Sequence, residues 1–130
     1  MNLQAEGRVY PAVELVIDPD RVRAFGLAVL APEGLGVPPT FATAAEFAAF
    51  PAIISDPDLG LDFSRVVHGD QRFTFTRPIV AGDELTAQLT VTSVKSLGGN
   101  DMVTSESVIT DAHGEHVVTA TSTLVVRAEA

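Results

Sequence analysis

Residues Arg65–Leu85, RVVHGDQRFTFTRPIVAGDEL, contain the pattern that decides the fold. Within this stretch, Arg72–Thr76 alternates polar and aromatic residues, so that Phe73 and Phe75 share one face, as a half-buried strand requires. Pro78 ends the strand because proline lacks the amide hydrogen that a sheet ladder needs. An Ala-Gly-Asp turn follows, and the next strand begins after it.

Downstream of this stretch, the sequence indicates further antiparallel strands separated by turns. Apolar residues alternate in each strand, and a Gly-Gly turn and an Asp-Ala-His-Gly-Glu loop separate them. We expect strands at Val66–Arg77, Glu84–Lys95, Met102–Thr110 and His116–Arg127.

The N-terminal half carries the signals for a short strand and a first helix. Val9–Ile17 alternates loosely and is expected to form the strand. Asp18-Pro19 then places a capping side chain ahead of a proline at the first helical position. The helix is expected to continue to about Leu30 with one apolar face, and the glycines and prolines of Pro32–Pro39 indicate a loop.

A second helix is expected from Thr40 through the sequence TFATAAEFAAFPAII. Glu46 is its only charged residue, so we expect a helix that is buried nearly all round. Pro51 is expected to kink or end it. Because no other element could cover so apolar a helix, the sheet should curl around it, which predicts an α+β fold in a single domain, residues 1–130.

Composition excludes several classes of function. The 130-residue chain has a net charge of −9 and only eight Lys and Arg residues, which argues against nucleic acid as a partner. It has no cysteine, so disulfides, thiolate metal sites and a cysteine nucleophile are excluded. No apolar run is long enough for a membrane span and the first residues lack a signal core, so we expect a cytoplasmic protein without a membrane association. No Gly-x-Ser-x-Gly elbow or phosphate-binding loop is present, and no cofactor or metal is expected.

Four sequence segments carry a family resemblance that covers nearly the whole chain. The segments are VPPTFATAAEF at Val37–Phe47, HGDQRFTFTRPIVAGDEL at His68–Leu85, GGND at Gly98–Asp101 and DAHGEHVVTATSTLVVR at Asp111–Arg127. Together they resemble the hotdog-fold MaoC-like dehydratases and their FAS1-like N-terminal domains. The resemblance is closest to the non-catalytic type of subunit in two-subunit (3R)-hydroxyacyl-ACP dehydratases.

The resemblance implies a sheet wrapped around a central helix, and a dimer formed through a free strand edge. Catalytic members carry an Asp and a His in a D-x-N-P-x-H segment after the first helix. Here the matching region, LAVLAPEGLGVPPTF, has no Asp, no Asn-Pro and no His, and its loop is shorter. The resemblance therefore implies that a homologous catalytic subunit, or a second copy of the chain, is the partner and that acyl-CoA or acyl-ACP is the substrate.

Four residues at the start of the Val66–Arg77 strand are candidates for a site. His68 and Asp70 are two positions apart, and residues at that spacing share a face of a strand, so they could form an acid/base pair. A structural or channel-lining role is favoured for His68. Gln71 could bridge to a partner subunit or cap the strand locally. Gly69 is a candidate for the same substrate channel or subunit interface.

Other candidates have simpler interpretations. Phe41 and Phe47 on the second helix could line an acyl channel, or they could pack in the core. Arg77 could meet a phosphate of coenzyme A or of a phosphopantetheine arm, but an exposed arginine at a strand end is the preferred interpretation. His113 and His116 form a weak metal pair, and solvated turn residues are the favoured interpretation.

The resemblance and the residues together leave three functions open. The first is a subunit of a hydratase/dehydratase for 3-hydroxyacyl or trans-2-enoyl thioesters, which forms the acyl channel while its partner supplies the acid and base. The second is a hotdog thioesterase that uses Glu46, the only acid on the second helix. The third is a non-enzymatic acyl-binding or stabilising dimer.

Overall fold

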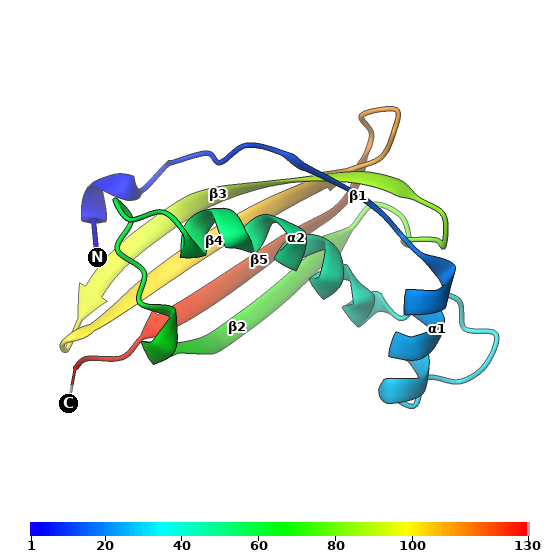
Figure 1. Ribbon diagram of the computed structural model, residues 1–130, viewed down its shortest axis with the longest axis horizontal. Coiled ribbons are helices and arrows are strands. Elements are labelled where there is room, and N and C mark those ends of the chain that lie inside the picture. Colours follow the sequence, from blue (N-terminus) through cyan, green and yellow to red (C-terminus); the bar gives the residue numbers. More distant parts are fainter. Residues whose placement is uncertain (130) are drawn as a thin grey trace.

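The computed structural model describes residues 1–129 and contains one five-stranded antiparallel sheet with a long helix lying on one face (Figure 1). A smaller helix, α1, projects beyond the end of this assembly. The strands are β1 (Val13–Val16), β2 (Val66–Phe75), β3 (Glu84–Leu97), β4 (Asn100–Thr110) and β5 (His116–Val126), and the helices are α1 (Pro19–Ala28) and α2 (Ala42–Ile54). Short 3-10 turns lie at Leu3–Ala5, Pro39–Phe41 and Phe63–Arg65.

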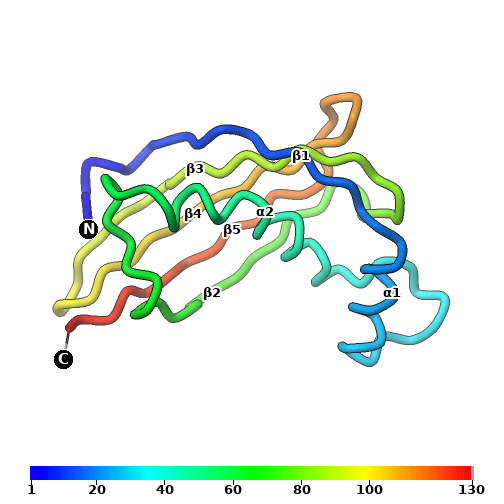
Figure 2. The backbone as a smooth tube through the Cα atoms, viewed as in Figure 1, coloured from blue at the N-terminus to red at the C-terminus, as the bar shows by residue number. Residues whose placement is uncertain are grey.

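The strand order β1-β3-β4-β5-β2 places the ten-residue strand β2 at one edge of the sheet. Among the described residues β2 forms a ladder with β5 alone, so its other side carries the backbone groups of a free edge. The opposite edge is the four-residue strand β1 together with the chain that leads into it, which runs along β3 (Figure 2). The amide of Tyr10 donates to the carbonyl of Leu89 at 2.9 Å, which fastens that segment to the sheet.

The expected strand at residues 9–17 is therefore shorter than predicted. Only Val13–Val16 is regular strand, and Val9 makes an isolated bridge to Thr90. Between the Val9–Thr90 bridge and the Val13–Ala87 pair the register shifts by one residue, which interrupts the ladder to β3.

Helix α2 packs on the sheet through one face, so the prediction of a helix buried nearly all round is wrong. Its buried residues are Ala42, Ala45, Glu46, Ala49, Phe50 and Ile53, whereas Phe47 is 45% exposed and Ile54 is 38% exposed. The helix continues through Pro51 to Ile54, so the proline does not end it. Pro51 has no amide hydrogen to donate to the carbonyl of Phe47, one helical turn earlier. Both residues are exposed, so water can bond to that carbonyl instead.

The capping of α1 is the one that the sequence predicts. The Asp18 side chain accepts a hydrogen bond from the Asp20 amide at 2.9 Å, and Pro19 occupies the first turn. At the other end, the Ala31 amide donates to the Gly26 carbonyl at 2.9 Å, which is the closing bond of a Schellman motif. That motif puts its next-to-last residue, Leu30, in the left-handed region at φ 58.

Replacing Leu30 with glycine is expected to raise the free energy of unfolding by about 0.5 to 1 kcal/mol. Leu30 is 90% exposed, so its side chain has little packing to lose, while its backbone conformation is unfavourable for a residue with a Cβ. Urea denaturation of both proteins measures the change. A Val29→Gly variant, one residue earlier and at negative φ, should lose stability instead.

Candidate functional site

Several hollows mark the surface. One lies where β2 ends and α2 begins, and we call it the proline hollow. It has a volume of about 300 Å³. Arg77 and Thr76 are the polar side chains that face it, and no carboxylate or imidazole lines it. Its walls are Val37, Pro38, Pro39, Phe75, Thr76, Arg77, Pro78 and Ile79.

A second hollow lies between α2 and the beginning of β2, and we call it the phenylalanine groove. Its volume is also about 300 Å³, and His68 is its only titratable residue. Phe47 lies at this groove with its ring 6.5 Å from that of His68. The lining residues are Phe47, Phe50, Pro51, Ile54, Phe63, Val66, His68 and Leu124.

Phe41, the other aromatic candidate for a channel, lines neither hollow. It is 3% exposed and packs edge-on against Phe25, with the two ring centroids 5.3 Å apart. In this structure Phe41 joins α1 to the core, which is the packing role that the sequence left open.

A β-bulge at Gly69 separates His68 from Asp70. His68 pairs with Leu124 but Asp70 pairs with Thr123, so one extra residue is inserted between them. Because Leu124 and Thr123 point to opposite faces of β5, His68 and Asp70 do so on β2, and the expectation that they share a face is wrong. Asp70 is instead 3.0 Å from the exposed Arg72 on its own strand.

The close approach of two backbones explains the glycine at this bulge. A Cβ added at Gly69 would lie 3.3 Å from the side chain of Val125 and 3.4 Å from the carbonyl of Thr123. Gly69 is therefore a residue of strand packing, and its predicted place in a channel wall stays a prediction.

Gln71, in contrast, reaches into the core. Its amide nitrogen is 3.3 Å from Oε2 of Glu46, and its amide oxygen is 2.6 Å from the hydroxyl of Ser122. The Ser122 hydroxyl is also 2.9 Å from Glu46 Oε2. We call these three residues the Glu46 cluster; they join α2 to β2 and β5.

Glu46 is fully buried, with 0% of its surface exposed. Burial raises the pKa of its carboxyl above the ordinary value, and the hydrogen bonds from Ser122 and Gln71 and the charge of His68 oppose this rise without cancelling it. A carboxyl in this position has no contact with solvent or with either hollow, so it does not favour the thioesterase interpretation.

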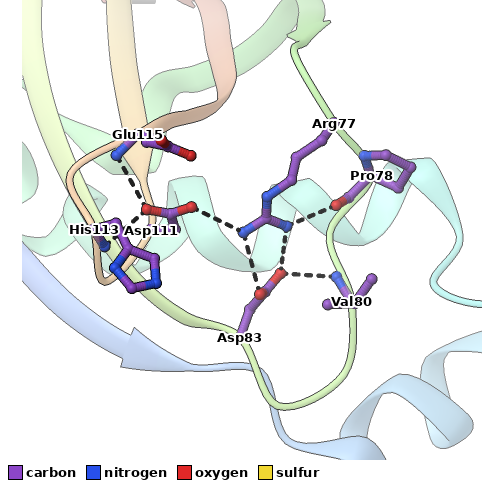
Figure 3. Close-up of polar contacts among 7 residues, drawn as sticks. All are labelled: Arg77, Pro78, Val80, Asp83, Asp111, His113 and Glu115. Carbon is purple, nitrogen blue, oxygen red and sulfur yellow. Dashed lines mark hydrogen bonds and ion pairs between the residues drawn. The ribbon is translucent and has the colours of Figure 1, made fainter.

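Arg77 holds the end of β2 to two loops (Figure 3). Its guanidinium lies 2.9 Å from one carboxylate oxygen of Asp83 and 3.2 Å from the other, and it is 3.5 Å from Asp111 in the β4–β5 loop. The same Asp83 accepts from the Val80 amide at 2.8 Å. Arg77 is thus engaged by carboxylates, and the geometry supports neither a phosphate-binding role nor a simple exposed arginine.

The two histidines of the β4–β5 hairpin do not form a metal site. His116 is held between two threonines, with Nδ1 2.6 Å from Thr76 and Nε2 2.7 Å from Thr119. The His113 amide donates to Asp111 in the hairpin turn. Within residues 1–129, no group of His, Asp and Glu side chains is arranged to hold a metal ion.

The Glu46 cluster is the feature that sequence reasoning missed. Glu46 is the only acid of its helix, but its partners lie 25 and 76 residues away in the sequence. A signal was present, because small polar residues interrupt the apolar alternation on the inward faces of β4 and β5. These residues are Ser105, Ser107 and Ser122, all buried.

Comparison with known proteins agrees with this architecture. Residues 33–120 match the model of the FAS1-like, dehydratase domain region. A UPF0336 protein of Leifsonia xyli is 48% identical over 145 aligned positions, which cover 99% of this chain and 97% of the relative. The chain belongs to the FAS1-like dehydratase family.

Solved structures place this FAS1-like dehydratase chain among hotdog proteins. The HadBC (3R-hydroxyacyl-ACP dehydratase) complex of Mycobacterium tuberculosis superposes with a TM-score of 0.76 at 26% identity, over 96% of this chain and 98% of that one. A MaoC-like dehydratase gives a TM-score of 0.79 at 26% identity, over 95% of this chain and 42% of that one. The predicted hotdog fold and the predicted family are thus confirmed. Among residues 1–129, no helix has the length and apolar character needed to cross a bilayer.

Proposed function

We propose that this chain is the non-catalytic, acyl-channel-forming subunit of a heteromeric hydratase/dehydratase for 3-hydroxyacyl and trans-2-enoyl thioesters. The observation that carries the proposal is the proline hollow, which lies at the start of α2 and has no carboxylate or imidazole in its walls. Val37, Pro38 and Pro39 of that hollow belong to the segment in which catalytic relatives are expected to carry their Asp and His.

The chemistry requires groups that this hollow does not offer. Dehydration removes a proton from the carbon next to the thioester carbonyl and releases the β-hydroxyl as water, so a base and an acid must converge on the substrate. Thr76 and Arg77 are the polar groups of the proline hollow, and His116 and two aspartates already engage them. A homologous partner would supply the acid and the base.

The phenylalanine groove supports the acyl-channel half of the proposal. It is lined almost wholly by aromatic and aliphatic side chains along α2, which suits a hydrocarbon chain. Phe47, 45% exposed beside it, is expected to contact the acyl chain, and His68 would stand at its rim rather than act as a base.

The free edge of β2 supports a partner subunit. In the comparison, HadBC is a complex of two subunits. An exposed ten-residue edge strand next to an apolar groove is the kind of surface that a second hotdog sheet can extend. We therefore expect the catalytic subunit to pair along β2.

The test is hydration of a trans-2-enoyl-CoA, followed by loss of absorbance of the conjugated thioester. The purified chain alone should give no turnover above buffer. After coexpression with a MaoC-like subunit that carries the Asp and His segment, the purified complex should turn over at least about a hundredfold faster than either component. A complex whose partner lacks its catalytic histidine is the matched control and should be inactive.

Three outcomes would overturn the proposal. Turnover by the folded chain alone, abolished by His68→Ala, would assign the chemistry to this subunit. A stable complex that is no faster than the partner alone would favour the non-enzymatic acyl-binding dimer. Release of free CoA by the chain, abolished by Glu46→Gln, would instead revive the thioesterase.

A further inference from the structure

The short contacts of the Glu46 cluster depend on where its hydrogens lie. Ser122 Oγ lies 2.9 Å from Glu46 Oε2 and 2.6 Å from the amide oxygen of Gln71. A hydroxyl has a single hydrogen, so it can donate to only one of these oxygens. If Glu46 were ionised, the other oxygen would face the Ser122 oxygen with no hydrogen between them.

A protonated Glu46 removes this conflict. The carboxylic O–H then donates to Ser122 Oγ, and the Ser122 hydroxyl donates to the Gln71 amide oxygen, so each short contact contains one hydrogen. The second carboxyl oxygen, Glu46 Oε1, is buried and has no hydrogen-bond partner among the described residues. An unpartnered carbonyl oxygen of a neutral acid costs far less than a buried oxygen that carries charge.

We propose that Glu46 is a neutral carboxylic acid in the folded protein at neutral pH, and that it is a positioning residue, which through Ser122 fixes the orientation of the Gln71 amide on the edge strand β2. This inference concerns the chain itself and does not rest on the proposed function.

The surroundings of Glu46 support a neutral acid. Burial raises the pKa of this carboxyl, as described above. On β2, His68 is the titratable group whose charge acts on it, while Asp70 and Arg72 pair with each other on the other face. On the other strands, no lysine or arginine lies beside the carboxyl. The charged or titratable residues of those strands are at the strand ends or on the outer face of the sheet, and they are Glu14, Glu84, Lys95, Asp101, Glu106 and His116.

The orientation of Gln71 follows from the protonation state. With Glu46 neutral, the Gln71 oxygen points to Ser122 and its nitrogen lies against Glu46 Oε2 and the Arg72 carbonyl, 3.4 Å away. Ionisation would draw the Ser122 hydrogen to Glu46 and leave the Gln71 oxygen beside a bare acceptor, so the amide must reorient. Because Gln71 is half-buried on the free edge of the sheet, this reorientation changes the groups available there.

Nuclear magnetic resonance of protein with ¹³C-labelled glutamate and ¹⁵N-labelled glutamine side chains tests both parts. One glutamate carboxyl resonance should have the chemical shift of a protonated acid at neutral pH, and it should be missing in Glu46→Gln. As the pH is raised, this resonance and that of the Gln71 amide should change with the same midpoint. Glu106→Gln, which removes a carboxyl from the outer face of β4, should leave both unchanged.

Stability provides a second measurement that does not need an assigned resonance. A group whose pKa is raised in the folded state contributes its full stabilisation at a pH below the pKa of the unfolded chain. That stabilisation is lost as the pH rises through the folded pKa. Wild type should therefore lose stability relative to Glu46→Gln as the pH rises, and the difference should be constant in acid. If Glu46→Gln does not fold, Ser122→Ala should still move the Glu46 and Gln71 resonances of a folded protein.

The inference is overturned if the Glu46 carboxyl titrates together with the exposed glutamates. It is also overturned if the Gln71 amide resonance does not respond to the charge of Glu46, or if Glu46→Gln, which can still donate to Ser122, fails to keep the Gln71 amide in its wild-type environment.

Discussion

Replacing Arg77 with alanine is expected to lower the free energy of unfolding by about 1 to 3 kcal/mol at neutral pH. The arginine joins the end of β2 to the turn before β3 through two hydrogen bonds to Asp83, at 2.9 and 3.2 Å, and both side chains are largely shielded from water. Alanine would leave the Asp83 carboxylate partly buried without its positive partner. Denaturant unfolding at pH 7 measures the loss.

Arg77→Ala should also reduce the loss of unfolding free energy that the protein shows as the pH is lowered. Burial raises the pKa of Asp83, but the hydrogen bonds from Arg77 and from the Val80 amide outweigh it and hold that pKa below its ordinary value. A carboxyl whose pKa is lowered in the folded state stabilises the protein at a pH above the pKa of the unfolded chain. This stabilisation is lost as the pH falls through the folded pKa. Wild type and Arg77→Ala should therefore differ most at neutral pH and approach each other in acid.

Arg72→Ala is the matched control for this experiment. Arg72 also pairs with an aspartate, at 3.0 Å, but its side chain is 77% exposed and that of Asp70 is 51% exposed. An exposed pair contributes little because water and salt screen it. Equal losses for the two variants would mean that burial does not distinguish the pairs and that Arg77 does not hold the loops.

The parts of the fold that the sequence predicts are those with a local physical signal. The alternation at Phe73 and Phe75 identifies β2, and Asp18-Pro19 identifies the beginning of α1, because side-chain direction and capping depend on adjacent residues. The apolar α2 likewise predicts a sheet that curls around it. The strand order, with β2 at the edge, was not predicted, because pairing between strands distant in the sequence leaves no local pattern.

The candidate site was harder to predict because its geometry depends on residues distant in sequence. The bulge at Gly69 inverts the faces of His68 and Asp70, and its physical cause is the close approach of β5, which no local pattern reveals. The partners of Glu46 come from β2 and β5. Arg77 looked like an exposed strand end because its two carboxylate partners belong to different loops.

Replacing Phe75 with proline is expected to weaken association with the proposed catalytic subunit by at least about tenfold, while the chain stays folded. The Thr76 amide donates to the Val117 carbonyl at 2.8 Å, so it faces β5. Amides alternate in direction along a strand, and the Phe75 amide therefore points to the free edge. Proline removes that outward donor without removing a bond to β5.

Two further variants separate the amide from the ring and from the fold. Phe75→Thr loses the aromatic ring, which is 36% exposed, but keeps the amide, so it should bind the partner more tightly than Phe75→Pro. Thr74→Pro removes an amide that faces β5 and should destabilise the chain itself. Titration of the labelled chain with the catalytic subunit gives the affinities, and thermal unfolding checks the fold. Wild-type affinity in a folded Phe75→Pro protein would show that the partner does not extend the sheet at this end of β2, because a partner strand there needs the donor that proline lacks.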